Sequence, residues 1–194
     1  MNFSKRGQLT IFVIIAIVIV ALIAIYFLVR GDTETLNVSA ELMPVFNYYK
    51  SCIEAETKTA IEIAESQGGY IDSSEYNPAS EYAPFSSELN FLGFPIPYWH
   101  YISGNGLIKE QMPSKKDIEN EIANYVEERI NDCDFDSFYA QGYDIQFNRP
   151  SARVTINDEK VDVEVLSDLT VSKGESSGRV EKHDISVGSK LGKF

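Results

Sequence analysis

A long apolar segment near the N-terminus limits what this chain can fold into more than any other feature. Every residue from Ile11 to Val29 is apolar, and Leu9 and Thr10 extend the segment to 21 residues. A helix of this length, at about 1.5 Å per residue, spans roughly 30 Å, the thickness of a bilayer's hydrocarbon core. Helices buried in soluble proteins are rarely apolar on every face over such a length. Leu9 to Val29 is therefore predicted to be a transmembrane helix.

A cleaved secretory signal is the main alternative for this segment. Lys5 and Arg6 precede the apolar run, and Val38-Ser39-Ala40 contains the small residues that signal peptidases prefer. The run is longer than the apolar part of a typical signal peptide, which has roughly 7 to 15 residues. A polar stretch that begins at Arg30 also separates the run from the cleavage sequence. We therefore favour a signal anchor that is retained.

The charges on either side of the apolar segment predict its orientation. Lys5 and Arg6 lie on the N-terminal side, whereas acidic residues follow Arg30 on the other side. Basic flanks stay in the cytoplasm, so the N-terminus is predicted to be cytoplasmic and the C-terminal part extracytoplasmic. The predicted organisation is a cytoplasmic flank (1–8), a transmembrane helix (9–29), a juxtamembrane linker (30–38) and one extracytoplasmic domain (39–194).

The extracytoplasmic part is strongly acidic. All 29 acidic residues, but only 14 of the 17 basic residues, lie after position 31. Such a charge repels the phosphates of nucleic acids and anionic lipid surfaces, so we expect no nucleic-acid partner. By itself the acidic surface indicates only solubility in a salty or cell-surface setting.

Cys52 and Cys133 are the only cysteines of the chain. Outside the cytoplasm, an even pair of cysteines favours a disulfide over a metal site or a nucleophile. A disulfide that closes a loop of about 80 residues stabilises the folded state by up to about 4 kcal/mol. On the same side of the membrane, Asn37 begins an Asn-Val-Ser sequon and is the candidate glycosylation site.

The residues at the start of the apolar segment carry a family resemblance. Lys5-Arg6-Gly7-Gln8-Leu9-Thr10-Ile11-Phe12, followed by the apolar run, resembles the start of archaeal prepilin-like proteins with class III signal sequences. It also resembles a set of uncharacterised archaeal single-pass membrane-anchored proteins. The resemblance covers about residues 5–29 and implies an archaeal envelope protein.

In the prepilin-like family, a dedicated peptidase cuts between the glycine and the glutamine, which are Gly7 and Gln8 here. The freed apolar helix then packs into a filament core. Phe12 departs from the family pattern, because a glutamate that helps to set the register between subunits usually stands at that position. A pilin-like filament subunit processed between Gly7 and Gln8 is therefore kept as an alternative.

Two amphipathic helices are predicted after the linker. Apolar residues recur at helical spacing from Ser39 to Gln67, with Ser39 as the N-cap and Gly68-Gly69 as the stop. Ser114 to about Asp132 forms the second helix, because Ser114 and Asp117 resemble a capping box. Each cysteine continues the apolar stripe of its helix, so the disulfide is expected to join the two helices.

After Gly142 the apolar pattern changes to every second residue, as in β-strands. The alternating positions are Tyr143, Ile145, Phe147, Val154, Ile156, Val161, Val163, Val165, Leu169, Val171, Ile185 and Val187. Turns are predicted at Asn157–Lys160 and Lys173–Gly178. We predict four or five antiparallel strands in a meander with one face on the helices, hence an α+β fold. The residues after Val187 contain no stop signal, which is typical of a chain that continues beyond Phe194.

Residues 70–101 combine nine aromatic side chains with four prolines. The simplest interpretation is that these rings cover the gap between the helices and the sheet. Alternatively, aromatic rings on a proline-stiffened loop present a large contact area at low entropic cost to a protein or glycan partner. The candidate binding surface is then Tyr98, Trp99, His100 and Tyr101.

No sequence motif points to an enzyme. The chain lacks the nucleophile elbow, the phosphate loop and the paired histidines or cysteines of common catalytic and metal sites. Asp132, Asp134 and Asp136 alternate as in a calcium loop, but Ser137 and Tyr143 replace its glycine and glutamate. We predict no cofactor and no metal. The leading hypothesis is a non-enzymatic binding or structural protein, and an envelope hydrolase with paired carboxylates is an alternative.

Overall fold

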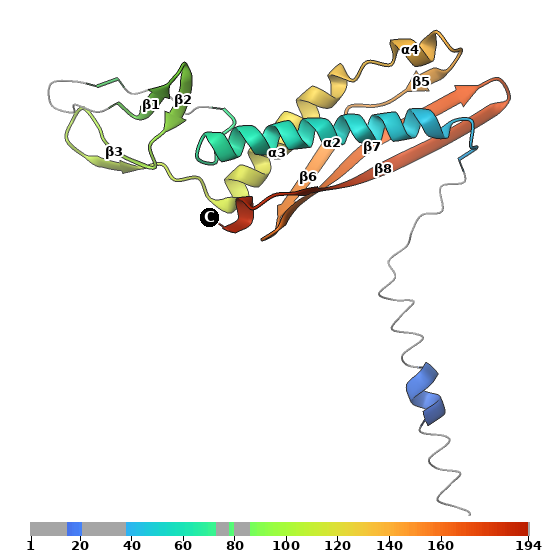
Figure 1. Ribbon diagram of the computed structural model, residues 1–194, viewed down its shortest axis with the longest axis horizontal. Helices are drawn as coiled ribbons and strands as arrows, with labels where there is room; N and C mark the ends of the chain where they lie inside the picture. Colours follow the sequence, from blue (N-terminus) through green and yellow to red (C-terminus); the bar gives the residue numbers. More distant parts are fainter. Residues whose placement is uncertain (1–14, 21–37, 73–77, 80–85, 194) are drawn as a thin grey trace, which may run out of the picture. The chain divides into compact units, whose positions relative to one another are not determined.

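The structure is a computed structural model that describes residues 15–20, 38–72, 78–79 and 86–193 (Figure 1). The chain divides into two compact units, Met1–Asn37 and Val38–Phe194. In the first unit, residues 15–20 are helical and their side chains are exposed. No helix among the described residues is both long and apolar enough to cross a membrane. The remainder of the predicted segment from Leu9 to Val29 lies outside the described residues.

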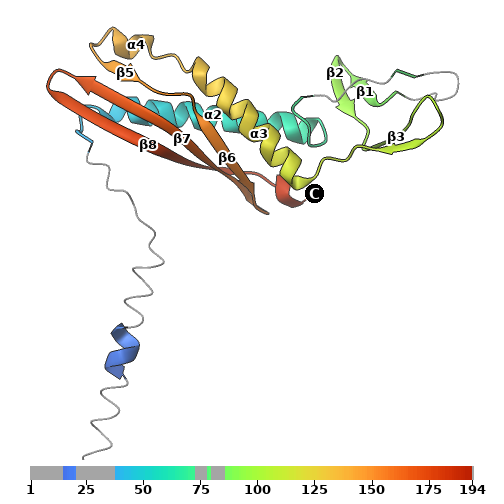
Figure 2. The same cartoon turned by 180° about the vertical axis from the view of Figure 1, so that it is seen from behind.

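The second unit is an α+β domain, as predicted. Its two long helices are α2 (Met43–Ser66) and α3 (Lys115–Arg129), and its main sheet contains four antiparallel strands. Figures 1 and 2 show α2 running along the sheet and α3 crossing α2 at an angle. One continuous apolar core joins both helices to one face of the sheet, with Tyr49, Ile53, Ile122 and Val163 among its most buried side chains.

Helix α2 ends as predicted but begins later. The backbone N–H of Gly69 donates to the carbonyl of Ala64, and Gly68 and Gly69 both have positive φ, which suits glycine at a helix end. At the start, Ser39 does not cap the helix, because residues 39–42 form a separate turn. Leu42 occupies the N-cap position without a side-chain hydrogen bond, and Pro44 lies in the first turn, where its missing N–H costs nothing.

Helix α3 confirms the predicted capping box. The Ser114 hydroxyl accepts a hydrogen bond from the Asp117 backbone N–H at 3.2 Å, and the Asp117 carboxylate accepts one from the Ser114 N–H at 2.9 Å. The Ser114 hydroxyl, 2.6 Å from the Asp117 carboxylate, and the Ser114 N–H both donate to that carboxylate and lower the pKa of Asp117 below its ordinary value. The helix ends at Arg129 and continues as a short 3₁₀ helix, Ile130–Asp132, to the end that the sequence predicted.

The main sheet is organised around its longest strand, β7 (Lys160–Lys173). Strand β8 (Ser176–Gly188) pairs along one side of β7, and β6 (Ser151–Ile156) and β5 (Asp144–Gln146) pair with successive parts of its other side. The predicted meander is therefore correct for the last three strands only. Because β7 has 14 residues, it is long enough to pair with both short strands.

The exposed edge of β6 is covered by side chains of α3. The Glu127 carboxylate accepts a hydrogen bond from the Ala152 N–H at 2.7 Å, and the Glu119 carboxylate accepts one from the Ile156 N–H at 3.0 Å. The two glutamates are eight residues apart and thus lie on the same side of the helix. Unpaired N–H groups on an edge strand invite pairing with other chains, and here two of them are satisfied internally.

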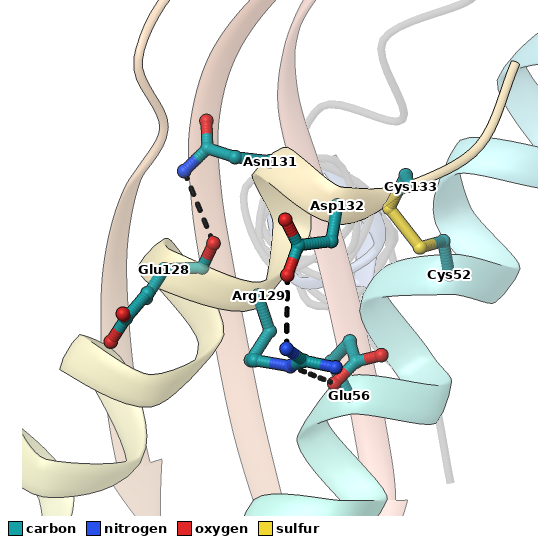
Figure 3. The surroundings of a disulfide bond; sticks show 7 residues. All are labelled: Cys52, Glu56, Glu128, Arg129, Asn131, Asp132 and Cys133. Carbon is teal, nitrogen blue, oxygen red and sulfur yellow. Dashed lines mark hydrogen bonds and ion pairs between the residues drawn. A yellow bond between two sulfur atoms is a disulfide. The ribbon is translucent and has the colours of Figure 1, made fainter.

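The predicted disulfide is present. Cys52 of α2 is bonded to Cys133, which follows the 3₁₀ helix, with 6.3 Å between the two Cα atoms. Figure 3 shows Arg129 beside this bond, where its guanidinium lies 2.9 Å from Asp132 and 3.5 Å from Glu56 of α2. The covalent bond and the ion pairs together fix the C-terminal end of α3 against α2.

His183 of β8 is buried in the core. Its ring is edge-on to Tyr49, with 4.8 Å between centroids, and its Nε2 lies 3.2 Å from the Ser167 carbonyl oxygen. Burial lowers the pKa of His183 below its ordinary value, although the Ser167 carbonyl and nearby Asp184 act in the opposite direction. His183 is therefore neutral in the folded protein at neutral pH.

Acidification from about pH 6.5 to 5 is expected to destabilise the domain, because unfolded His183 takes up a proton that the folded form binds less well. The stabilisation from neutral His183 is complete above the pKa that this histidine has in the unfolded chain. It decreases as the pH falls toward the lower pKa of His183 in the folded protein, by at most about 1.4 kcal/mol per pH unit. Urea unfolding at a series of pH values measures this slope. His183→Gln should remove it, whereas His100→Gln, at an exposed histidine, should keep it. An equal slope in both variants would contradict the assignment.

Candidate binding surface

Two small β-hairpins occupy the region that the sequence predicted as an aromatic loop. β1 (Glu88–Phe91) pairs with β2 (Phe94–Pro97), and β3 (His100–Ile102) pairs with β4 (Ile108–Glu110). Their strands have three or four residues each, and they form sheets separate from the main sheet. Such hairpins are marginal on their own, so contacts with the rest of the chain must hold them.

Gln111 is the residue that joins the two hairpins. Its side-chain amide donates to the carbonyl of Ser87 at 2.9 Å and to that of Tyr98 at 2.6 Å, and its backbone N–H donates to the carbonyl of Trp99. The Tyr70 hydroxyl in turn donates to the Gln111 carbonyl. Gln111, which lies between β4 and α3, thus connects the base of both hairpins to Tyr70, just after the end of α2.

Trp99 supplies a second attachment. Its indole Nε1 donates to the carbonyl of Gly68 at 2.8 Å. A Cβ added at Gly68 would lie 3.3 Å from that nitrogen, so glycine allows the ring to approach the end of α2 closely. The tryptophan is nevertheless 43% exposed, because the other parts of the ring face outward.

The β1–β2 hairpin has one apolar face. The register pairs Phe91 with Phe94 and Leu89 with Ile96, and cross-strand partners lie on the same face of a sheet. Of these four, Leu89, Phe91 and Phe94 are exposed and Ile96 is half-buried. We call these four residues and Leu92 at the turn the apolar hairpin. A single exposed apolar residue is ordinary, whereas a contiguous group indicates a contact site.

Leu92 at the tip of this hairpin is in an unfavourable backbone conformation. Its φ is +54° and that of Gly93 is +93°, as expected for a two-residue turn of type I′. Asparagine, aspartate or glycine usually occupy the first position of that turn, and leucine is strained there. Leu92 is also 84% exposed, so no packing in the fold offsets the strain. A strained, outward-facing apolar residue indicates selection for a contact rather than for folding.

Leu92→Asn is expected to stabilise the hairpin by about 1 kcal/mol, because asparagine tolerates positive φ and no buried contact is lost. Hydrogen exchange of the β1 and β2 amides measures this local stability. Leu107→Asn is the matched control, since Leu107 is also exposed and does not have positive φ. Faster exchange in Leu92→Asn than in the parent would show that the side chain supports the turn.

The predicted surface residues lie at the base of the hairpins. Tyr98, Trp99 and His100 are exposed and Tyr101 is half-buried. The expectation that the rings of residues 70–101 cover the gap between helices and sheet holds only in part. None of the described rings belongs to the core that joins these layers, but Tyr70 is buried and Trp99 lines a groove with walls from α2, α3 and β6. That core takes its aromatic side chains from α2 and from residues 125–147.

Sequence reasoning missed the most exposed apolar residues of this region. They are Phe91 and Leu92 in the first hairpin and Ile102, Leu107, Ile108 and Met112 in and after the second. A glycine within a short apolar run, as in Phe-Leu-Gly-Phe, is a signal for a hairpin turn. The prediction for this region rested on its aromatic residues and did not use that signal.

A groove of about 520 Å³ lies beside Trp99. Its walls come from the end of α2, the start of α3, the end of β6 and the short 3₁₀ helix η2 (Leu191–Lys193). Trp99, Met112, Ile118 and Leu191 make most of it apolar. Gly69 also belongs to the wall, and a Cβ there would lie 2.8 Å from Pro113, so glycine keeps this corner packed tightly.

A polar depression of about 600 Å³ is lined by residues of β6, β7 and β8 and by Lys50 and Glu54 of α2. Two of its carboxylates are paired: Asp162 contacts Ser186, Lys160 and Asn157, and Glu164 contacts Lys182 at 2.7 Å. These hydrogen bonds lower the pKa values of Asp162 and Glu164. A general acid needs the opposite shift, so Asp162 and Glu164 are not suited to that role.

The structure describes some of the other predicted sites and not others. Cys52 and Cys133 are joined, whereas Gly7, Gln8 and Asn37 lie outside the described residues. Among the described residues, no group of three or more His, Cys, Asp or Glu side chains is arranged to hold a metal ion. Comparison of the chain with protein-family models, with curated proteins and with solved structures finds no match.

Proposed function

We propose that this protein is a non-enzymatic, membrane-anchored protein of the cell envelope. In this proposal Leu9 to Val29 crosses the bilayer, the N-terminus is cytoplasmic, and the α+β domain lies outside and makes a binding contact. The apolar hairpin is the observation that carries the proposal. It combines three exposed large side chains with a strained leucine whose exposure serves no purpose in the fold.

Several further features support the extracytoplasmic location and the absence of catalysis. The Cys52–Cys133 disulfide is typical of an oxidising compartment. The apolar segment with its basic N-terminal flank has the pattern of a single-pass anchor. Asp162 and Glu164 of the sheet depression are paired with Lys160 and Lys182. Most of the exposed large apolar side chains of the second unit lie in the hairpins.

Photocrosslinking in the native membrane tests whether the hairpin makes a contact. Benzoylphenylalanine replaces Phe91 in one variant and Thr155, an exposed residue on the outer face of the sheet, in the control. We expect a covalent adduct from position 91 on irradiation and little or none from position 155. Equal absence of adducts at both positions would overturn the proposed binding role.

A pilin-like subunit is the second candidate, favoured by Gly7 and Gln8 at the start of the apolar run. N-terminal sequencing and intact mass of the protein purified without reductant separate the two. A chain that begins at Met1 or Asn2 is a permanent anchor. A chain that begins at Gln8 has been processed, and filament assembly then becomes the leading function.

A further inference from the structure

We propose that the apolar hairpin inserts its tip into a lipid bilayer of low negative charge, as a second membrane contact besides the N-terminal segment. The inference deepens the proposed binding function and rests on it. Three properties of the hairpin favour lipid over a protein, a glycan or a second copy of the chain.

The first property is the absence of charge. No Asp, Glu, Lys or Arg occurs from Leu89 to Ile108, a run of 20 residues in a chain of which 24% is charged. Within the hairpins, charged residues occur only in the parts of the strands away from the tips, as Glu88, Lys109 and Glu110. Two copies of a strongly acidic domain repel each other, whereas an uncharged lipid surface does not. A charged side chain at the tip would oppose entry into hydrocarbon, and the run from Leu89 to Ile108 contains none.

The second property concerns the backbone of β2. In the observed register, Pro95 pairs with Asn90 and Pro97 pairs with Glu88. Phe91 and Phe94 flank the two-residue turn and form a hydrogen-bonded pair. Bonded and non-bonded pairs alternate along an antiparallel hairpin, so Pro95 and Pro97 are in non-bonded pairs and their backbone nitrogens face away from β1. An ordinary residue there would direct a free N–H outward. Proline has no backbone N–H. This edge of β2 therefore lacks hydrogen-bond donors that lipid could not satisfy and that a pairing strand of another protein would need.

The third property is that polar groups near the hairpin tips are satisfied internally. The Gly93 N–H donates to the Asn90 side chain at 3.0 Å. In the neighbouring hairpin, the single hydroxyl hydrogen of Ser103 has two acceptors within reach, the Asn105 side-chain oxygen and the Leu107 carbonyl. The side-chain oxygens of Asn90 and Asn105 are thus already engaged within the hairpins, which makes this region less suited to sugar hydroxyls. Tyr98 and Trp99 at the base have the amphipathic rings that suit the membrane–water interface.

The single tryptophan of the chain makes a direct test possible. Phe94→Trp combined with Trp99→Phe moves the fluorophore to the hairpin tip, and Leu166→Trp combined with Trp99→Phe moves it to an exposed apolar position on the main sheet. Each full-length variant is reconstituted into phosphatidylcholine vesicles with or without bromine atoms on the acyl chains. Circular dichroism checks that both variants fold as the parent does. Trp99→Phe removes the hydrogen bond to the Gly68 carbonyl in both variants alike, so its loss does not account for a difference between them.

We expect bromolipid to quench the tip tryptophan and to leave the sheet tryptophan unquenched. Adding Phe91→Asn and Leu92→Asn to the tip variant should abolish the quenching, while Leu166→Asn in the tip variant should not. Anionic lipid should weaken the quenching at low salt, and added salt should restore it. Quenching of the tip that survives the asparagine substitutions, or is equal at the tip and on the sheet, would overturn the inference.

Comparison with the photocrosslinking result separates the two proposals. An unquenched tip together with a protein adduct from position 91 would overturn lipid insertion and leave the binding role standing. An unquenched tip with no adduct at all would overturn both.

Discussion

Replacing Cys52 by alanine is expected to lower the free energy of unfolding of the domain by about 4 kcal/mol. The disulfide joins residues that are 81 positions apart, and closing a loop of that length removes many conformations from the unfolded chain. At a few degrees per kcal/mol for a domain of this size, the melting temperature should fall by roughly 10 °C. Circular dichroism of the full-length protein in detergent without reductant measures the change.

Two controls identify the bond as the cause. Ser51→Ala changes an exposed neighbour on α2 and should leave the melting temperature unchanged. Reductant should lower the parent to the level of the Cys52→Ala variant and have no effect on the variant itself. Equal melting temperatures of the oxidised parent and the variant would show that the disulfide does not stabilise the fold.

Removing both carboxylates that cover the edge of β6 is the second substitution with a large expected effect. Glu119→Ala with Glu127→Ala leaves the N–H groups of Ile156 and Ala152 without their acceptors. A hydrogen bond to a charged group contributes roughly 1.5 to 3 kcal/mol, so the pair should cost about 3 kcal/mol or more. Urea unfolding gives the total, and hydrogen exchange should accelerate at these two amides.

Glu128→Ala is the control for this pair, because Glu128 is on the same helix but exposed. It should change stability by less than about 0.5 kcal/mol. Glutamine at positions 119 and 127 should cost less than alanine, since the amide oxygen still accepts a hydrogen bond. A double alanine variant as stable as Glu128→Ala would mean that water replaces the carboxylates without cost.

The parts of the fold that could be predicted depend on local physical rules. Ser114 and Asp117 cap α3 because the side chain of each accepts a hydrogen bond from the backbone N–H of the other. Gly68 and Gly69 end α2 because they accept positive φ. Period-two burial along β7 follows from one buried sheet face. The pairing of β5 with β7 depends on strand lengths and on register across the sheet, which local patterns do not encode.

The candidate site was less predictable for the same reason. Tyr98 and Trp99 stand out as aromatic residues among prolines, but their exposure depends on where Gln111 and Gly68 hold the hairpins. These contacts join residues that are 13 and 31 positions apart. Leu92 could not be identified from its residue type, because propensity favours asparagine or glycine in that turn and the sequence contradicts the preference.

The position of the disulfide also determines how the domain responds to mechanical load. When a force pulls the chain from Val38 toward its C-terminal end, the bond between Cys52 and Cys133 carries the tension directly. The residues between the two cysteines, which include both hairpins and α3, then bear none of it. Oxidation should shorten the stretched chain by roughly 280 Å, at about 3.5 Å per residue, in a single-molecule pulling experiment. The hairpin surface would keep its shape while the segments outside the loop are extended.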